Sequence, residues 1–177
     1  MRLQQIPMIG GLFLVLVSTV GCTAAIQLTP VTPLGTDLHS YSAVVFLAES
    51  KVPDDVRNEV GSLQLLTVTK IRALNAFKSV ELGDGAGSGS GTLLVKATIS
   101  SIKKVSSTAR FMLGAFAGRA SMTMDIVFVD AASGKQLGAY AITGKSGGTG
   151  YSGGTSDAVR KAADGIADIL AKNYSGH

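Results

Sequence analysis

The chain has 177 residues, of which 46% are hydrophobic and 16% charged, and its formal net charge at pH 7 is +4. This length accommodates one domain with its own core and is too short to favour two. The charge is mild and the basic pairs have no interleaved aromatic residues, which argues against nucleic-acid binding. The chain has a single cysteine, so an internal disulfide bond is excluded.

Residues 1–21 have the pattern of a secretory signal peptide. Arg2 precedes an apolar run at residues 8–20, which is interrupted only by small or weakly polar residues. The run is too short to span a bilayer comfortably, because a transmembrane helix needs about 20 apolar residues. A charged segment followed by a short apolar run is typical of export signals. We therefore expect residues 1–21 to be removed.

The signal ends in Ser-Thr-Val-Gly-Cys at residues 18–22. This stretch resembles the lipobox of bacterial lipoproteins, although Thr19 stands where that motif prefers leucine. By this resemblance Cys22 becomes the mature N-terminus and carries a thioether-linked diacylglycerol and an amide-linked acyl chain such as palmitate. Thr23, in place of an aspartate, implies the outer membrane with the protein facing the periplasm. The resemblance thus implies the membrane as a partner, through an N-terminal lipid anchor.

The region after the cysteine is predicted to divide into a tether and one domain. Residues 22–40 contain Pro30, Pro33 and Gly35 and show no sustained period, which is typical of a flexible tether between the lipid and the domain. Residues 41–177 are predicted to form a single periplasmic domain. Its first elements are an apolar strand at residues 41–48, a helix to about Asn75 with one apolar face, and a second strand at residues 77–82.

The second half of the domain alternates in the manner of a sheet. A glycine-rich linker at residues 83–91 precedes strands at residues 93–105, 121–130 and 136–143, and a hairpin with Gly134 at a positive φ joins the last two. A closing helix carries an apolar stripe from Val159 to Leu170. The order predicts an α/β (α+β) fold, with a mixed sheet of about five strands that ends in an antiparallel meander. Two main helices pack on the sheet, in an order that allows them to lie on opposite faces.

No motif in the chain supports catalysis. The Gly-Lys-Ser at residues 144–146 lacks the preceding glycine of a phosphate-binding loop. The GxGxxG at residues 148–153 is followed by a helix alone, whereas a dinucleotide site needs a further strand with an acidic residue. His39 lies in the predicted tether and His177 at the terminus, where neither has the packed surroundings of a general base. We therefore expect a protein that is not an enzyme, with no catalytic residue, metal or cofactor.

Two surfaces remain as candidates for binding. The first is an apolar loop with small residues at GxxxG spacing, which suits a protein partner or insertion into a membrane. The second is the polar face of the meander, which suits a small ligand or a glycan, although a cross-strand ion pair between Lys96 and Asp125 also explains its charges. The candidate interaction loop comprises Phe111, Leu113, Gly114, Phe116, Gly118 and Arg119, and the candidate polar sheet face comprises Lys96, Thr98, Thr123 and Asp125.

Three stretches together resemble a known family. They are RFMLGAFAGRAS from Arg110, then MDIVFVDAASGKQL, then GKSGGTG. This pattern resembles the DUF4410 proteins, uncharacterised lipoproteins of Gram-negative bacteria, for which no catalytic residues are established. A more distant resemblance, to lipoproteins of the curli-secretion and peptidoglycan-synthase-activator type, implies action through protein contacts.

The functional expectation follows from the absent catalytic groups and these resemblances. We expect a lipid-anchored outer-membrane lipoprotein that acts non-enzymatically through contacts with an envelope protein or with copies of itself. The alternative is a small-ligand or glycan-binding module that uses the polar sheet face.

Overall fold

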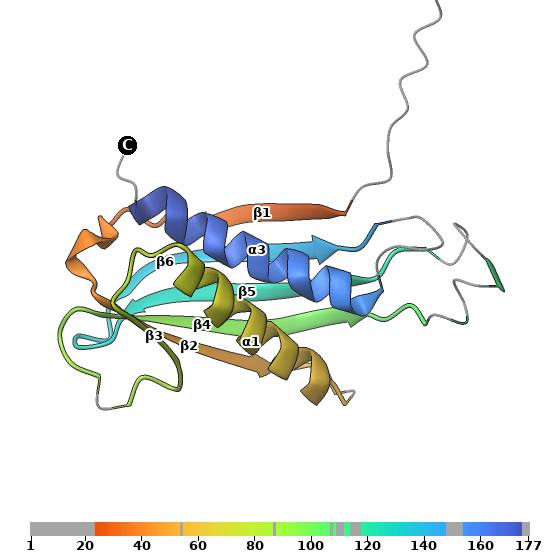
Figure 1. Cartoon of the computed structure of the whole chain (residues 1–177), viewed down its shortest axis with the longest axis horizontal. Helices are drawn as coiled ribbons and strands as arrows, with labels where there is room; N and C mark the ends of the chain where they lie inside the picture. The colour runs from red at the N-terminus through yellow and green to blue at the C-terminus, as the bar shows by residue number, and fades with distance from the viewer. Residues whose placement is uncertain are drawn as a thin grey trace, which may run out of the picture.

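The sheet and its two long helices occupy most of the chain that the structure describes (Figure 1). A computed structural model describes residues 24–53, 55–86, 88–106, 108, 112–113, 118–147 and 154–174. Its elements are β1 (Ala25–Thr32), a 3-10 turn η1 (Leu38–Ser40), β2 (Ala43–Ser50), α1 (Arg57–Ala73), β3 (Ser79–Leu82), β4 (Thr92–Lys103), β5 (Ser121–Asp130), β6 (Gln136–Lys145) and α3 (Thr155–Tyr174).

The six strands form one mixed sheet in the order β1-β6-β5-β4-β2-β3. Strand β2 is parallel to both β3 and β4, whereas β4, β5 and β6 form an antiparallel meander with β1 antiparallel at its edge. The predicted single domain with a mixed sheet, a terminal meander and two packed helices is therefore confirmed. The β5–β6 hairpin is also as predicted, because Gly134 has a φ of 70° and its N–H donates to the carbonyl oxygen of Asp130 at 2.8 Å.

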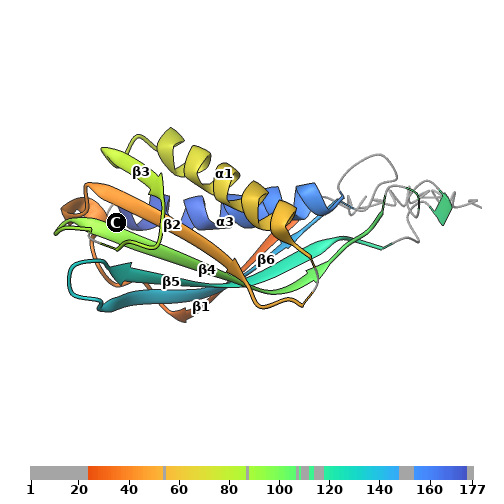
Figure 2. The same cartoon turned by 90° about the horizontal axis from the view of Figure 1, so that it is seen from below.

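Both helices lie on the same face of the sheet, side by side (Figure 2). The alternation along the strands explains this, because one face of β4 and β5 is buried along most of its length while the other keeps polar or small side chains at many positions. An ion pair joins the helices, with 2.5 Å between Lys70 Nζ on α1 and Asp164 Oδ1 on α3. The arrangement on opposite faces is therefore wrong, since a sheet with one apolar face needs both helices there.

A glycine allows α3 to approach β6 closely. A Cβ atom built on Gly144 would lie 2.6 Å from the backbone nitrogen of Ala162, and closer still to the carbonyl oxygen of Ala158. Real Cβ atoms essentially never make such contacts. The absent side chain thus sets the distance between the last helix and the sheet.

The predicted flexible tether contains ordered elements. Strand β1 pairs with β6 from Ala25, opposite Lys145, to Thr32, opposite Ala139, with a bulge near Pro30. Its inward side chains, Ile26 and Leu28, pack against the core beside α3. The expectation of an irregular segment at residues 22–40 was therefore wrong for residues 25–32, which form an edge strand of the domain.

Candidate functional site

The candidate interaction loop is held at both of its ends by the sheet. Strand β4 leads into it at Lys103, and β5 leaves it at Ser121. The residue before β5, Ala120, is fully buried, and its N–H donates to Ser146 Oγ at 3.0 Å. In return, the N–H of Ser146 donates to the carbonyl oxygen of Ala120 at 2.9 Å. The loop therefore joins two fixed points of the sheet, the end of β4 and the start of β5, next to the end of β6.

Three of the predicted loop residues fall within the described part of the chain. Leu113 has helical backbone and is 56% exposed, and its neighbour Met112 is 73% exposed. Gly118 lies beside Lys103, whose Nζ would be 3.6 Å from a Cβ at that glycine, and Arg119 is half-buried. The predictions for Phe111, Gly114 and Phe116 fall outside the described residues, as does that for Cys22.

Basic side chains surround the base of this loop. Lys104 Nζ lies 2.9 Å from Glu59 Oε1 and donates to the carbonyl oxygen of Asp55 at 3.1 Å, so its charge is shared with the start of α1. In the described part of the chain, no carboxylate forms an ion pair with Lys103, Arg119 or Lys145. An exposed apolar pair and uncompensated cations thus lie at one end of the sheet.

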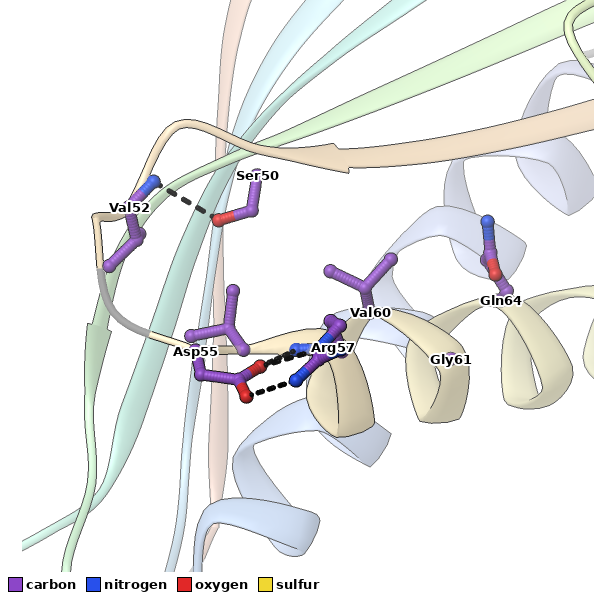
Figure 3. A pocket seen from close by; sticks show the side chains of 8 residues that line it. Ser50, Val52, Asp55, Arg57, Val60, Gly61 and Gln64 are labelled. Carbon is purple, nitrogen blue, oxygen red and sulfur yellow. Dashed lines mark hydrogen bonds and ion pairs between the residues drawn. The ribbon is translucent and has the colours of Figure 1, made fainter.

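A pocket that the sequence did not reveal lies between the end of β2 and the start of α1 (Figure 3). It has a volume of about 430 Å³ and is lined by Ser50, Val52, Asp55, Val56, Arg57, Val60, Gly61 and Gln64. The signal that points to it is topological, because open α/β sheets bind ligands outside the carboxyl ends of parallel strands.

The charged groups of this pocket neutralise each other. Arg57 forms a two-point contact with Asp55, from Nε to Oδ1 at 3.0 Å and from Nη2 to Oδ2 at 2.7 Å. The hydrogen bonds from the Arg57 side chain, and then from its backbone N–H, hold the pKa of Asp55 below its usual value of 3.8. Figure 3 shows the two side chains facing each other. The pair leaves no free acid or base in the pocket, whose remaining walls are largely apolar.

The polar sheet face lies on the side of the sheet without helices. Thr98 stands directly opposite Asp125, whereas Lys96 stands opposite Val127. Thr123 Oγ1 lies 3.1 Å from Thr143 Oγ1 on β6. No ion pair joins Lys96 to Asp125 among the described residues, so the cross-strand explanation of these two charges is not supported. No helix covers this face. None of its four candidate residues lines the pocket between β2 and α1.

Three further contacts lie at the opposite end of the sheet. His39 Nδ1 is 2.6 Å from Asp37 Oδ1, and the His39 ring stacks on Tyr174 with 4.4 Å between the ring centroids. The His39 side chain remains 54% exposed despite these contacts, so it lacks the packed surroundings of a general base, as expected from the sequence. Tyr41 donates to Asp130 Oδ2 at 3.0 Å, and burial, followed by this hydrogen bond, raises the pKa of Tyr41.

The described residues contain no group of three or more histidine, cysteine, aspartate or glutamate side chains that could hold a metal ion. Within the same residues, no helix is long and apolar enough to cross a membrane.

The observations above define a class: a small α+β domain with one helix-covered sheet face, one open face and an apolar loop at one end. Residues 89–150 match the family model described as "Domain of unknown function (DUF4410)", so the predicted family is confirmed over that part of the chain. The match covers β4, β5 and β6 and includes the loop between β4 and β5.

Solved structures with the same fold come from PelC dodecamers of Paraburkholderia phytofirmans. One PelC chain is 13% identical with a TM-score of 0.58, and the alignment covers 86% of this chain and 98% of that one. A single-substitution variant of PelC is 11% identical with a TM-score of 0.56, covering 86% of this chain and 99% of its own. At such identities the likeness concerns the fold alone. No curated protein matches the sequence.

Proposed function

We propose that the protein is a lipid-anchored lipoprotein of the outer membrane, which faces the periplasm and acts non-enzymatically through protein contacts. The observation that carries the proposal is the position of the lipobox cysteine, because Cys22 stands only three residues before Ala25, the first residue of β1. Acylation there would join the folded domain almost directly to the membrane. Two or more acyl chains give stable anchoring, since each buried methylene contributes about 0.8 kcal/mol.

The preferred contact is with further copies of the same chain. The fold likeness to chains of a dodecamer supports self-association, although the identity of 13% leaves the interface itself to be found. The two edges of the sheet, β1 and β3, differ in sequence and length. A contact between two different surfaces of identical copies is heterologous, and such contacts build rings when the rotation closes.

The anchor is tested by Cys22→Ser in a bacterial host that processes lipoproteins. The expected result is an unlipidated precursor that keeps residues 1–21 and migrates more slowly, with the wild-type chain carrying the added acyl mass by mass spectrometry. Cys22 is the chain's only cysteine, so any thioether-linked lipid must be at this position. A normal-sized, detergent-partitioning product from the variant would refute the anchor.

Self-association is tested separately, by native mass spectrometry of the lipidated wild-type protein released from detergent micelles. The expected result is a discrete oligomer whose mass is a multiple of the mature chain. A monomer at every concentration, with another envelope protein co-purifying in fixed ratio, would replace self-association by a partner protein.

A second candidate function is supported by the open sheet face. Both helices lie on the other face, which leaves Lys96 and Asp125 exposed and able to contact a small ligand or a glycan. A glycan array with the wild-type protein and Asp125→Ala tests this function. Binding that is lost in this variant and kept in Lys135→Ala, an exposed charge in the distant hairpin, would favour it. Absence of binding by the wild type would remove it.

A further inference from the structure

The position of the loop relative to the start of β1 follows from the strand register. Ala25 pairs with Lys145, Lys145 with Ser121, and Ser121 with Lys103. These four residues therefore form one row across β1, β6, β5 and β4. With neighbouring strands about 4.8 Å apart, Ala25 and Lys103 are about 14 Å apart along this row. Figure 1 shows the beginning of β1 at the same end of the sheet as the end of β4 and the beginning of β5.

The chain between the acylated residue and this row is short. Only Thr23 and Ala24 lie between Cys22 and Ala25, and the three steps from Cys22 to Ala25, fully extended, reach at most about 10 Å. The headgroup region on each side of a bilayer is about 5–8 Å thick, from the difference between total and hydrocarbon thickness. A domain held by so short a connection keeps the row of Ala25, Lys145, Ser121 and Lys103 against the lipid surface.

The side chains at this end match the chemistry of such a surface. Met112 and Leu113, which are adjacent and exposed, project from the loop between β4 and β5. Lys103, Arg119 and Lys145 surround its base, and among the described residues none of them forms an ion pair with a carboxylate. Apolar side chains that enter the acyl boundary, with cations beside the phosphates, are typical of interfacial binding.

We propose that this end of the sheet docks on the outer membrane, with Met112 and Leu113 in the acyl boundary and Lys103, Arg119 and Lys145 on lipid phosphates. The proposal rests on the proposed acylation of Cys22 and adds a second, non-covalent contact to it. The acyl chains already supply the affinity, so the loop supplies orientation. It holds the strands upright on the membrane and prevents the domain from rotating about its anchor.

The experiment places a fluorophore at the loop of the full lipidated protein. Acylation blocks Cys22, the chain's only native cysteine, so a thiol introduced as Leu113→Cys can be labelled alone with an environment-sensitive nitrobenzoxadiazole group. The protein is reconstituted in vesicles of phosphatidylethanolamine and phosphatidylglycerol, with and without nitroxide-labelled lipids. Only protein that floats with the vesicles is read.

The matched control is Leu82→Cys on β3. Leu82 is a leucine of similar exposure, 53% against 56% for Leu113. It pairs with Phe46, which pairs with Val95 on β4. Val95 lies eight residues before Lys103, which places the control about 26 Å from the docking row.

Docking predicts that the Leu113 label loses most of its emission to nitroxide lipids while the Leu82 label keeps nearly all of its own. Equal quenching of the two labels in floated protein would overturn the proposal. A blue-shifted Leu113 label that nitroxide lipids do not quench would overturn it in favour of a protein that covers the loop. Protein that carries no acyl mass and does not float with the vesicles would refute the lipid anchor, and the docking with it. The flotation step distinguishes this failure from a failure of the docking alone.

Discussion

Single residues set the spacing between the layers and close the turns. Gly144 lets α3 approach β6, and Asp130 closes the hairpin that follows β5. The side chain of Asp130 accepts hydrogen bonds from Ser133, at 2.7 Å from the backbone nitrogen and 2.6 Å from Oγ, and a third from Tyr41 at 3.0 Å. Both residues act on stability. Asp130 lies at the end of the sheet opposite to the proposed docking end, whereas Gly144 directly precedes Lys145, which belongs to it.

Gly144→Ala is expected to destabilise the protein. The added methyl group would overlap the backbone of α3 at Ala158 and Ala162, where no flexible side chain can move away. Overpacking of this kind costs about 1–3 kcal/mol, which is measured as a lower urea midpoint. The control is Gly61→Ala on α1, where nothing lies within 4 Å of the new Cβ. That change should stabilise the helix by up to about 1 kcal/mol, and a loss of stability there would contradict this interpretation of the glycines.

Asp130→Asn is expected to lower stability at neutral pH but not in acid. The hydrogen bonds from Ser133, first from its side chain and then from its backbone, and that from Tyr41 hold the pKa of Asp130 below its usual value of 3.8. The folded state thus favours the ionised form, and this stabilisation is present above pH 3.8 and is lost as the pH falls through the lower folded pKa. Melting temperatures of the two proteins should therefore differ at pH 7 and converge below pH 3.8. A difference that stays constant in acid would show that the carboxylate charge is irrelevant.

Among the elements, β1 departs most from expectation. Pro30 interrupts its short alternation and Pro33 follows its last residue, so the sequence does not indicate a strand there. Its partner β6 lies more than a hundred residues away in the sequence, and no local pattern predicts the pairing. The strand extends the meander to a fourth member and brings the start of the domain close in sequence to Cys22, the proposed site of acylation. With Cys22 acylated as proposed, the segment expected to be a spacer would determine how far the domain stands from the membrane.

Leu28→Ala tests whether β1 belongs to the core. The Leu28 side chain is half-buried against α3, near Gly165 and Ile142. Truncating a fully buried leucine to alanine lowers the unfolding free energy by about 2–5 kcal/mol. Because Leu28 is only half-buried, we expect a loss of about 1–2 kcal/mol. Val31→Ala on the same strand, where the side chain is 69% exposed, should change the unfolding free energy little. If both substitutions left the unfolding free energy unchanged, residues 25–32 would act as a tether and not as part of the core.

The elements that carry a clear period were predictable from the sequence. The alternation in β4 and β5 predicts strands, and the apolar stripe of α3 predicts a helix. The hairpin at Gly134 has the expected turn residues. The same alternation already implied that both helices share one face, because only one face of β4 is apolar throughout.

The candidate site was predictable only in part. Its apolar loop is recognisable in the sequence from Leu113 and the neighbouring glycines. The choice between a protein and a lipid partner, however, requires the three-dimensional structure. Only the register of β1, β6, β5 and β4 places both ends of the loop in one row with Ala25, three positions after the proposed acylation site. The pocket between β2 and α1 was missed because it depends on how a strand end and a helix start pack together.

For the whole molecule, docking by one end fixes what the other surfaces can do. The hairpin at Asp130 lies at the opposite end of the sheet (Figure 1). In the proposed orientation the strands would run away from the membrane and this hairpin would point into the periplasm. The two sheet edges, β1 on one side and β3 on the other, face sideways in the plane of the membrane. Neighbouring copies on the same membrane would thus meet edge to edge, which is the geometry that the proposed self-association needs.

Cysteines on the two edges test this arrangement in cells. Gln27 on β1 and Glu81 on β3 are both exposed, and the oxidising periplasm allows disulfides to form between copies. The double variant Gln27→Cys/Glu81→Cys should give a ladder of bands above the dimer on a non-reducing gel, because each copy can be linked on both sides. Each single variant should remain largely monomeric, since a heterologous contact brings β1 next to β3 and not next to another β1. As a control, Ser133→Cys/Glu81→Cys pairs the β3 edge with the hairpin that points away from the membrane, and no ladder is expected. A strong dimer from Gln27→Cys alone would instead indicate a two-fold contact between β1 edges, which joins copies in pairs and cannot build a ring by itself.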